Sequence, residues 1–310
     1  SIYETCNAFF AWKESGEVVA WGNAMFSGLP NDIATRLSPG VIAIYRTDDA
    51  FAALVEGGEV VVWGTEDFDG VSRQTAAKLA GGVTAICSTD EDFAAVREGG
   101  EVVTWGEGPS SSIPRAVADK LTANVIAIYT TAHAMAALKL DGEVVTWGDA
   151  QFGGNSRDVA DELASGIWAI YATKSAFAAV NGDGAVATWG SASYGGDSRK
   201  VADKLSSGVT LICSTDGAFA ALKSSGEVVT WGNHRSGGDI GQVADRLTGG
   251  VTHIYSTESA FAAMKDDGEV VTWGNPGCGG NSREVCRSLT SDVIAVYSNA
   301  ATFTALKICS

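Results

Sequence analysis

The chain alternates short apolar segments with polar, glycine-containing turns along its whole length. One cycle contains a β-branched and aromatic segment, Val251–Tyr255, and a short apolar segment, Phe261–Lys265. A third segment, Glu269–Trp273, alternates between apolar and polar residues and ends in Trp-Gly. An Asp-Asp-Gly turn separates the last two segments, as in a β-hairpin. The pattern therefore predicts three short strands in each cycle.

A glycine-rich loop follows each Trp-Gly, and a short helical pattern follows the loop. Val201 and Leu205 lie at i and i+4, which places them on one face of a helix, and Ser198 precedes them as the expected N-cap. The same pair recurs at Ile33/Leu37, Val117/Leu121, Val159/Leu163, Val243/Leu247 and Val285/Leu289, and in weakened form at Thr75/Leu79. We expect one or two helical turns between consecutive sets of strands.

The cycle is an internal repeat of 42 residues without insertions. Its anchors are Trp21, Trp63, Trp105, Trp147, Trp189, Trp231 and Trp273. A three-stranded sheet exposes two apolar faces, which neighbouring copies cover when the sheets stack radially. The sequence thus predicts a single all-β domain over residues 1–310, a seven-bladed β-propeller of mostly three-stranded blades, each with a short helix. An open β-solenoid is the alternative, and three hairpin-linked strands per unit disfavour it.

The two ends of the chain carry overlapping parts of the repeat. We expect strands from both termini to close the ring in a four-stranded blade made of residues 293–297, 303–307, 9–13 and 17–21. If residues 303–307 run antiparallel to residues 9–13, Cys309 lies beside Cys6. A disulfide there would lock the ring, and two unrelated terminal thiols are the alternative.

The remaining cysteines divide into two kinds. Cys278 and Cys286 share one loop and its helix, so their separation permits a second disulfide. Cys87 and Cys213 replace a tyrosine of other repeats and are expected to be buried small hydrophobic residues. The two disulfides would imply an oxidising, extracytoplasmic setting, either secreted or in an organelle lumen.

The repeat carries a family likeness. Gly142–Gly148 reads G-E-V-V-T-W-G and Gly208–Ile212 reads G-V-T-L-I. This unit resembles the regulator-of-chromosome-condensation repeat superfamily, and it is most similar to the β-lactamase inhibitory protein II branch. The resemblance implies a seven-bladed propeller whose binding face includes the loops between first and second strands.

The matching loop positions carry no aromatic residue, so inhibition of β-lactamase is not expected. They are Asp48/Asp49, Asp90/Glu91, Ala132/His133, Lys174/Ser175, Asp216/Gly217, Glu258/Ser259 and Ala300/Ala301. We take the charged members as partner-binding candidates: Asp48, Asp49, Asp90, Glu91, His133, Lys174, Asp216 and Glu258. Their acidity indicates either a partner-facing patch or plain solubility.

A second candidate set lies five residues after the repeat tryptophan. It consists of Phe26, Phe68, Phe152 and Tyr194. A recurrent position favours packing against the helix of the blade. The alternative is a set of exposed anchors for a partner.

The formal net charge of −16 argues against nucleic acid and anionic membrane as partners, and favours a protein with a basic surface. Every long apolar segment is interrupted by glycine or charge, so no membrane insertion is expected.

The sequence offers no constellation for catalysis. The three histidines occupy three different repeat positions, so no metal site is expected. Recurring carboxylates such as Glu59 and Glu101 start a strand in most repeats, which indicates a structural role rather than a catalytic pair. No phosphate-binding, dinucleotide or nucleophile motif occurs, and no cofactor is expected.

We therefore expect a non-catalytic protein-interaction or scaffold subunit that binds through loops of a propeller face. A carbohydrate-binding propeller is one alternative, so that a glycan ligand stays open. An inhibitor of a secreted enzyme is another alternative.

Overall fold

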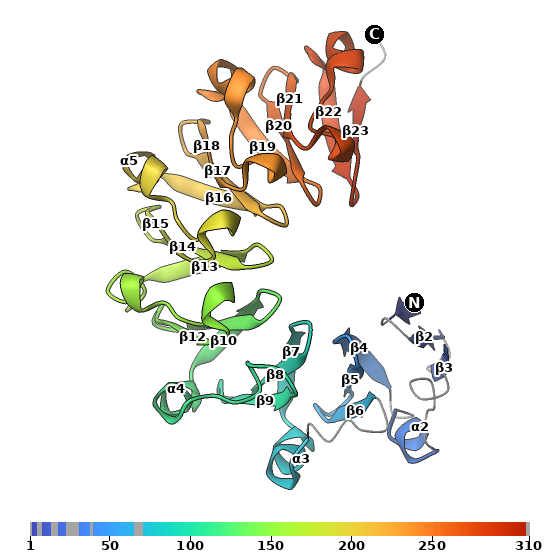
Figure 1. Cartoon of the computed structure of the whole chain (residues 1–310). Helices are drawn as coiled ribbons and strands as arrows, with labels where there is room; N and C mark the ends of the chain where they lie inside the picture. Colours follow the sequence, from blue (N-terminus) through green and yellow to red (C-terminus); the bar gives the residue numbers. More distant parts are fainter. Residues whose placement is uncertain are drawn as a thin grey trace. The chain divides into compact units, whose positions relative to one another are not determined.

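The computed structural model describes residues 2–4, 8–13, 18–22, 31–37, 40–64 and 71–307. Contacts divide the chain into two compact units, residues 1–140 with 145–149 and residues 141–144 with 150–310. A single domain over residues 1–310 stays a prediction. Both units consist of small antiparallel sheets joined by short helical connections (Figure 1).

The sheets of the first unit each contain three strands in chain order. They are β1 (Ile2–Glu4), β2 (Ala8–Trp12) and β3 (Val18–Gly22); β4 (Val41–Arg46), β5 (Ala50–Val55) and β6 (Val60–Gly64); β7 (Val83–Ser88), β8 (Asp92–Arg97) and β9 (Val102–Gly106); and β10 (Val125–Thr130), β11 (Ala134–Lys139) and β12 (Val144–Gly148). Of β12, only Val144 groups with the second unit.

The second unit continues the same pattern and ends with a sheet in which two strands are described. Its strands are β13 (Ile167–Ala172), β14 (Ala176–Asn181) and β15 (Val186–Gly190); β16 (Val209–Ser214), β17 (Ala218–Lys223) and β18 (Val228–Gly232); β19 (Val251–Ser256), β20 (Ala260–Lys265) and β21 (Val270–Gly274); and β22 (Val293–Ser298) and β23 (Phe303–Lys307). The predicted repeat of three-stranded propeller blades is thereby confirmed.

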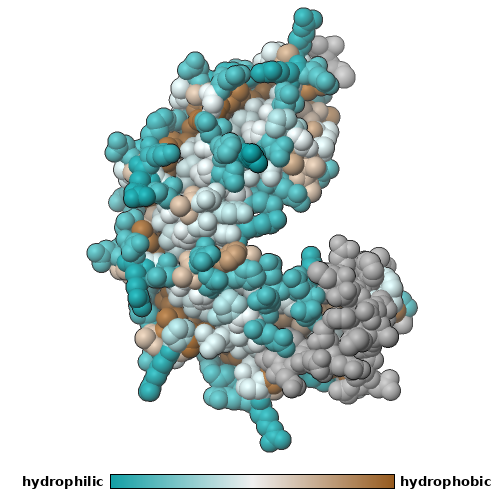
Figure 2. Space-filling view, in the orientation of Figure 1, coloured by the Kyte–Doolittle hydropathy of each residue, from teal (hydrophilic) through white to brown (hydrophobic). Residues whose placement is uncertain are grey.

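A helical segment precedes each sheet from β4 onward, as expected. These segments are α2 (Asn31–Leu37), α3 (Arg73–Leu79), α4 (Arg115–Ala118) with η1 (Asp119–Leu121), η3 (Arg157–Val159), η5 (Arg199–Val201) with α5 (Ala202–Leu205), η7 (Gly241–Leu247) and η9 (Arg283–Leu289). In the second unit they are largely 3-10 turns. One 3-10 turn also follows β12 and each third strand of the second unit: η2 (Ala150–Phe152), η4 (Ala192–Tyr194), η6 (His234–Ser236) and η8 (Pro276–Cys278). In Figure 2, polar side chains dominate the visible face of the second unit, and apolar residues show between them.

The two faces of each sheet differ, and this difference organises the core. Along β5, Ala50, Ala52 and Leu54 point to one side, and they pack with Phe93 and Trp105 of the next sheet. The same contact recurs in the second unit, where Ala218 and Ala220 pack with residues of β20 and β21. A small-residue face therefore lies on an aromatic face at each junction, which explains why the middle strand is buried on both sides.

A hydrogen bond reinforces several junctions between neighbouring sheets. The indole N–H of Trp189 donates to the carbonyl oxygen of Gly153, which lies in the loop after the preceding sheet, at 3.0 Å. Trp231 and Trp273 make the equivalent bonds to Gly195 and Gly237. The repeat tryptophan thus stacks on the phenylalanine of its own sheet, with centroids 5.2–5.4 Å apart in five blades. In three blades, Trp189, Trp231 and Trp273 also bind the blade before them.

The recurring glutamate at the start of the third strand has a structural partner. Arg36 binds Glu59 at 2.7 Å, and Arg246 binds Glu269 at 2.7 Å. Lys78–Glu101 and Lys204–Glu227 are the same pair in two other blades. The repeated carboxylate therefore ties a strand to the helix of its own blade, in agreement with the structural role inferred from its recurrence.

The strands at the two ends pair differently from our expectation. β2 hydrogen-bonds to β1 on one edge, with Ile2 opposite Ala11, and to β3 on the other. The expected four-stranded closing blade is therefore not formed, because β1 takes the edge of β2 that residues 303–307 were expected to occupy. Closure of the ring itself stays a prediction.

Candidate functional site

A buried threonine shapes the turn between the first and second strands in six sheets. The hydroxyl oxygen of Thr173 accepts a hydrogen bond from the amide of Ala176 at 3.0 Å, and the hydroxyl reaches the carbonyl oxygen of Tyr194 at 3.0 Å. Equivalent threonines stand at 47, 89, 131, 215 and 257, all nearly inaccessible to solvent. Sequence reasoning missed this residue, although its 42-residue recurrence was the available signal.

These turns are joined to one another by main-chain hydrogen bonds. In the first unit, the amide of Asp48 donates to the carbonyl oxygen of Asp90 at 2.7 Å, and the amide of Asp90 donates to Ala132 at 3.0 Å. In the second unit, Lys174 donates to Asp216, Asp216 to Glu258, and Glu258 to Ala300, at 2.8–3.0 Å. The candidate positions therefore form a continuous strip within each unit, held by backbone contacts that do not depend on their side chains.

The strip of the first unit is rich in carboxylates. Asp48, Asp49, Asp90 and Glu91 are exposed on two neighbouring turns. The half-buried His133 on the third turn places its Nδ1 atom 3.8 Å from a Glu91 carboxylate oxygen. These five candidates therefore lie on neighbouring turns. Main-chain hydrogen bonds hold the turns in place independently of the candidate side chains.

The strip of the second unit is mixed in charge. Lys174 forms an ion pair with Asp216 at 2.7 Å, so these two candidates neutralise one another. Glu258 is exposed on the next turn. The acidic character that the sequence indicated therefore belongs mainly to the first unit.

Two of the four aromatic candidates lie within the described residues. Phe26 and Phe68 lie outside the described residues. Phe152 and Tyr194 are half-buried, and Tyr194 packs against the cluster that includes Leu205 and Trp231. This contact favours the packing interpretation for Tyr194, and a partner-binding role for either residue stays a prediction.

Asp92 breaks the repeat, and sequence reasoning missed its role. It stands where Ala50, Ala134 and other blades carry alanine, and it is 0% exposed. Its carboxylate accepts the backbone N–H groups of Gly108 at 2.7 Å and Ser110 at 2.6 Å. Burial raises the pKa of this carboxyl, and the two amide hydrogen bonds oppose that rise. Asp92 thus fixes an atypical loop after β9, and the signal was an acidic residue inside an apolar strand.

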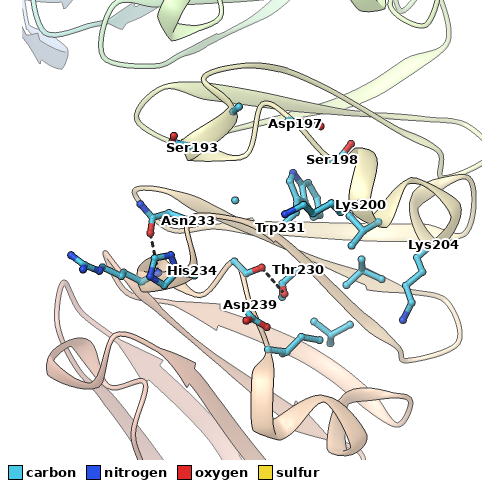
Figure 3. Close-up of a pocket in the computed structure, with 18 residues that line it drawn as sticks. Ser193, Asp197, Ser198, Lys200, Lys204, Thr230, Trp231, Asn233, His234 and Asp239 are labelled. Atoms are coloured by element: carbon cyan, nitrogen blue, oxygen red, sulfur yellow. Dashed lines mark hydrogen bonds between the residues drawn. The ribbon is translucent and has the colours of Figure 1, made fainter.

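A groove of about 900 Å³ lies along β18 in the second unit. Figure 3 shows Asp197, Ser198, Lys200 and Lys204 on one wall, with Asn233, His234 and Asp239 on the other. Asp197 is held by Arg199 at 2.6 Å, which lowers the pKa of that carboxyl to about 2. Ser198 is the N-cap residue of η5, as expected, but its side chain makes no capping hydrogen bond. The amide of Arg199 donates to the carboxylate of Asp197 instead.

The cysteine chemistry differs from our expectation. Cys278 and Cys286 are both free thiols, so the predicted disulfide between them is not formed. Cys278 ends η8, where its carbonyl oxygen accepts a hydrogen bond from the hydroxyl of Thr257 at 2.9 Å, while Cys286 is exposed on η9. The two thiols stay apart because Cys278 is anchored in η8 and Cys286 lies on the separate segment η9. Cys6 and Cys309 lie outside the described residues, and their bond stays a prediction.

Two further findings hold for the described part of the chain. No group of three or more histidine, cysteine, aspartate or glutamate side chains is arranged to hold a metal ion there. None of its helices is both long and apolar enough to cross a bilayer.

Two solved structures are similar to this chain in fold. Yeast RCC1 (Prp20), in a structure bound to Kap60, is similar at 17% identity over 99% of this chain and 91% of that chain, with a TM-score of 0.47. The ectodomain of the Physcomitrella patens receptor kinase CR4 is similar at 14% identity over 100% of this chain and 87% of that chain, with a TM-score of 0.45. At these values neither likeness indicates a function.

No protein-family model matches the sequence, and no curated protein matches it. The β-lactamase inhibitory protein II branch is not among the structures compared above, so that finer resemblance stays a prediction.

Proposed function

We propose that the chain is a non-catalytic interaction or assembly protein that binds a protein partner through the turn strip of its first unit. The observation that carries this proposal is the convergence of Asp48, Asp49, Asp90 and Glu91 on adjacent turns. Four exposed carboxylates at one place favour a partner with a basic surface, because complementary charge speeds encounter and disfavours wrong partners.

The rigidity of the strip supports the same proposal. The Asp48–Asp90 and Asp90–Ala132 main-chain bonds fix the turns before any partner arrives. A preformed surface loses little conformational entropy on binding, so more of the contact energy appears as affinity. Repeat scaffolds with variable residues on fixed turns suit protein recognition for this reason.

The test is affinity capture from the native source with three forms of the protein. The wild type is compared with a variant carrying Asp49→Lys and Glu91→Lys, and with a matched control carrying Asp158→Lys and Asp161→Lys on an exposed helical connection. We expect the first variant to lose a partner that the wild type and the control both retain. Capture should weaken as salt rises, because exposed charges are screened beyond about 8 Å at physiological ionic strength.

If the Asp49→Lys/Glu91→Lys variant and the Asp158→Lys/Asp161→Lys control lost the partner equally, net charge alone would explain binding. That result would refute a specific site. Purification of the wild type without any partner at low salt would also refute the proposal.

A further inference from the structure

The groove along β18 contains basic residues that the other repeats do not share. Lys200 lines this groove, and its position is not basic in any of the six other repeats. The residues there are Asp32, Gln74, Ala116, Asp158, Gln242 and Glu284. His234 and Arg235 also line the groove, and they too have no basic counterpart elsewhere in the repeat. Residues that one repeat alone contains are not needed for the common fold, so these three side chains indicate a local role.

The three basic side chains are accessible to a ligand. Lys200 on η5 and His234 on η6 face the groove from different segments, and both are exposed, as is Arg235 (Figure 3). Among the described residues, none of the three takes part in an ion pair, whereas Lys204 in the same groove binds Glu227 at 2.7 Å. In a protein with 37 acidic and only 21 basic residues, this groove therefore gathers positive charge that no carboxylate neutralises, and such a cleft attracts an anion.

Two carboxylates in the groove restrict the kind of anion. Asp197 accepts hydrogen bonds from Nε and Nη2 of Arg199 at 2.9 and 2.6 Å, so it is already paired and does not neutralise Lys200. Asp239 is exposed, and its Oδ1 atom accepts the amide of Gly241 at 2.8 Å. A free carboxylate repels a ligand that is negative along its whole length, but it accepts hydrogen bonds from hydroxyl groups. The ligand that fits therefore has both anionic groups and hydroxyl groups.

The uncharged lining of the groove suits the same chemistry. Ser193 and Ser198 contribute hydroxyl groups, and Asn233 contributes a side-chain amide. Val201 and Ile240 are half-buried and add apolar surface. Hydroxyl and amide groups exchange hydrogen bonds with the hydroxyls of a sugar, while apolar side chains contact the C–H groups of its ring. The volume of about 900 Å³ is that of a small-molecule site.

We propose that this groove binds an acidic saccharide, a short sugar chain that bears carboxylate or sulfate groups. Lys200 and Arg235 bind the anionic groups, and the planar guanidinium of Arg235 matches either oxyanion with two parallel hydrogen bonds. Asp239 accepts a hydrogen bond from a sugar hydroxyl. The lining residues all belong to the second unit, so this site is separate from the acidic strip of the first unit.

Isothermal titration calorimetry of the full chain tests the proposal with three sugars of equal length. Trigalacturonate supplies carboxylates, a sulfated galactotriose supplies sulfates, and unmodified galactotriose is the neutral control. We expect an acidic sugar to bind one-to-one with a Kd below about 1 mM. The neutral sugar should bind at least about tenfold more weakly, because it lacks charge-assisted hydrogen bonds. The tighter of the two acidic sugars identifies the anionic group.

Two double variants locate the binding site. Lys200→Ala with Arg235→Ala removes two positive charges from the groove, and Arg157→Ala with Arg287→Ala removes the same charge from exposed positions outside it. All four side chains are exposed, so both variants should fold, which circular dichroism can verify. We expect the groove variant to bind the acidic sugar at least about tenfold more weakly, since charge-assisted bonds are lost, and the control to bind as the wild type does.

A triglutamate peptide tests the competing class of ligand, an acidic peptide, which Asp239 disfavours. If triglutamate bound as tightly as the acidic sugars, the groove would be a general anion site and the saccharide assignment would be overturned. Binding of neither acidic sugar, or equal binding of the neutral one, would also overturn the proposal. Equal weakening in the two double variants would overturn the assignment to this groove. The partner proposed for the first unit is unaffected by any of these outcomes.

Discussion

The indole N–H of Trp231 donates a 2.9 Å hydrogen bond to the carbonyl oxygen of Gly195, in the loop that follows the preceding sheet. Because Trp231 also stacks on Phe219 within its own sheet, one side chain connects two blades. The two contacts act at the same junction and can be tested separately.

Replacing Trp231 with phenylalanine should keep a ring over Phe219 but leave the Gly195 carbonyl without its donor. We expect Trp231→Phe to lower the free energy of unfolding by about 1–3 kcal/mol, the cost of an unsatisfied buried group with some loss of packing. Trp168→Phe is the control, because Trp168 is 50% exposed and donates to Asn181 at 2.8 Å. Urea titration measures the free energy of unfolding of both variants. If both lost the same amount, the role assigned to the Trp231–Gly195 junction would be contradicted.

Gly195 itself should tolerate no side chain. Its φ is 99°, and a Cβ atom there would lie 2.6 Å from a ring carbon of Phe219. We expect Gly195→Ala to destabilise the protein by about 2–4 kcal/mol through backbone strain and overpacking. Gly182→Ala is the matched control, since no atom lies within 4 Å of its added Cβ, and thermal melting should barely distinguish it from the wild type.

The ion pairs of Glu101 should make stability depend on pH. Hydrogen bonds from Lys78 at 2.6 Å and Arg97 at 2.7 Å hold the pKa of the Glu101 carboxyl below its ordinary value. A lowered pKa gives stability that is present above the unfolded pKa and is lost as the pH falls through the folded pKa. We expect Glu101→Gln to cost about 0.5–1 kcal/mol at neutral pH, and the difference to vanish in acid.

Glu98→Gln, at an exposed turn position, provides the control for that comparison. Denaturant titrations at several pH values would contradict the ion-pair account if the Glu101→Gln penalty persisted unchanged in acid.

The four described thiols should differ sharply in reactivity. Burial raises the pKa of Cys87 to about 12 and that of Cys213 to about 11, so almost no thiolate forms at neutral pH. Cys286 is exposed and free. We expect iodoacetamide to alkylate Cys286 rapidly in the native protein and to leave Cys87 and Cys213 protected until unfolding. Peptide mass mapping over time measures this, and early labelling of Cys87 would contradict its raised pKa.

The sequence was sufficient for the repeat and its strands, since the 42-residue recurrence of Trp-Gly fixes where each third strand ends. It did not reveal which residues join neighbouring blades. The partner of Trp231 is a backbone carbonyl 36 residues earlier, and a carbonyl leaves no trace in the identity of a residue.

The sequence predicted which turn positions form the candidate site, but it did not predict how those turns contact one another. Sequence placed Asp48 and Asp90 at equivalent turns, and only the structure shows the amide-to-carbonyl bond that makes the turns neighbours. The Cys278–Cys286 disulfide was wrong because spacing along the chain does not report how each segment is anchored. The role of Asp92 was not predicted, because its burial depends on a loop whose amides of Gly108 and Ser110 donate to the carboxylate.

Each sheet has one face of small residues and one aromatic face, so the row of repeated sheets has a direction. A small-residue face accepts an aromatic face and not a second copy of itself, so a repeat fits only in one orientation between its neighbours. Duplication of one whole repeat in the gene would therefore create a new junction in which a small-residue face again meets an aromatic face. Such a chain can change its length by whole units, and each added unit supplies one further turn to the binding strip.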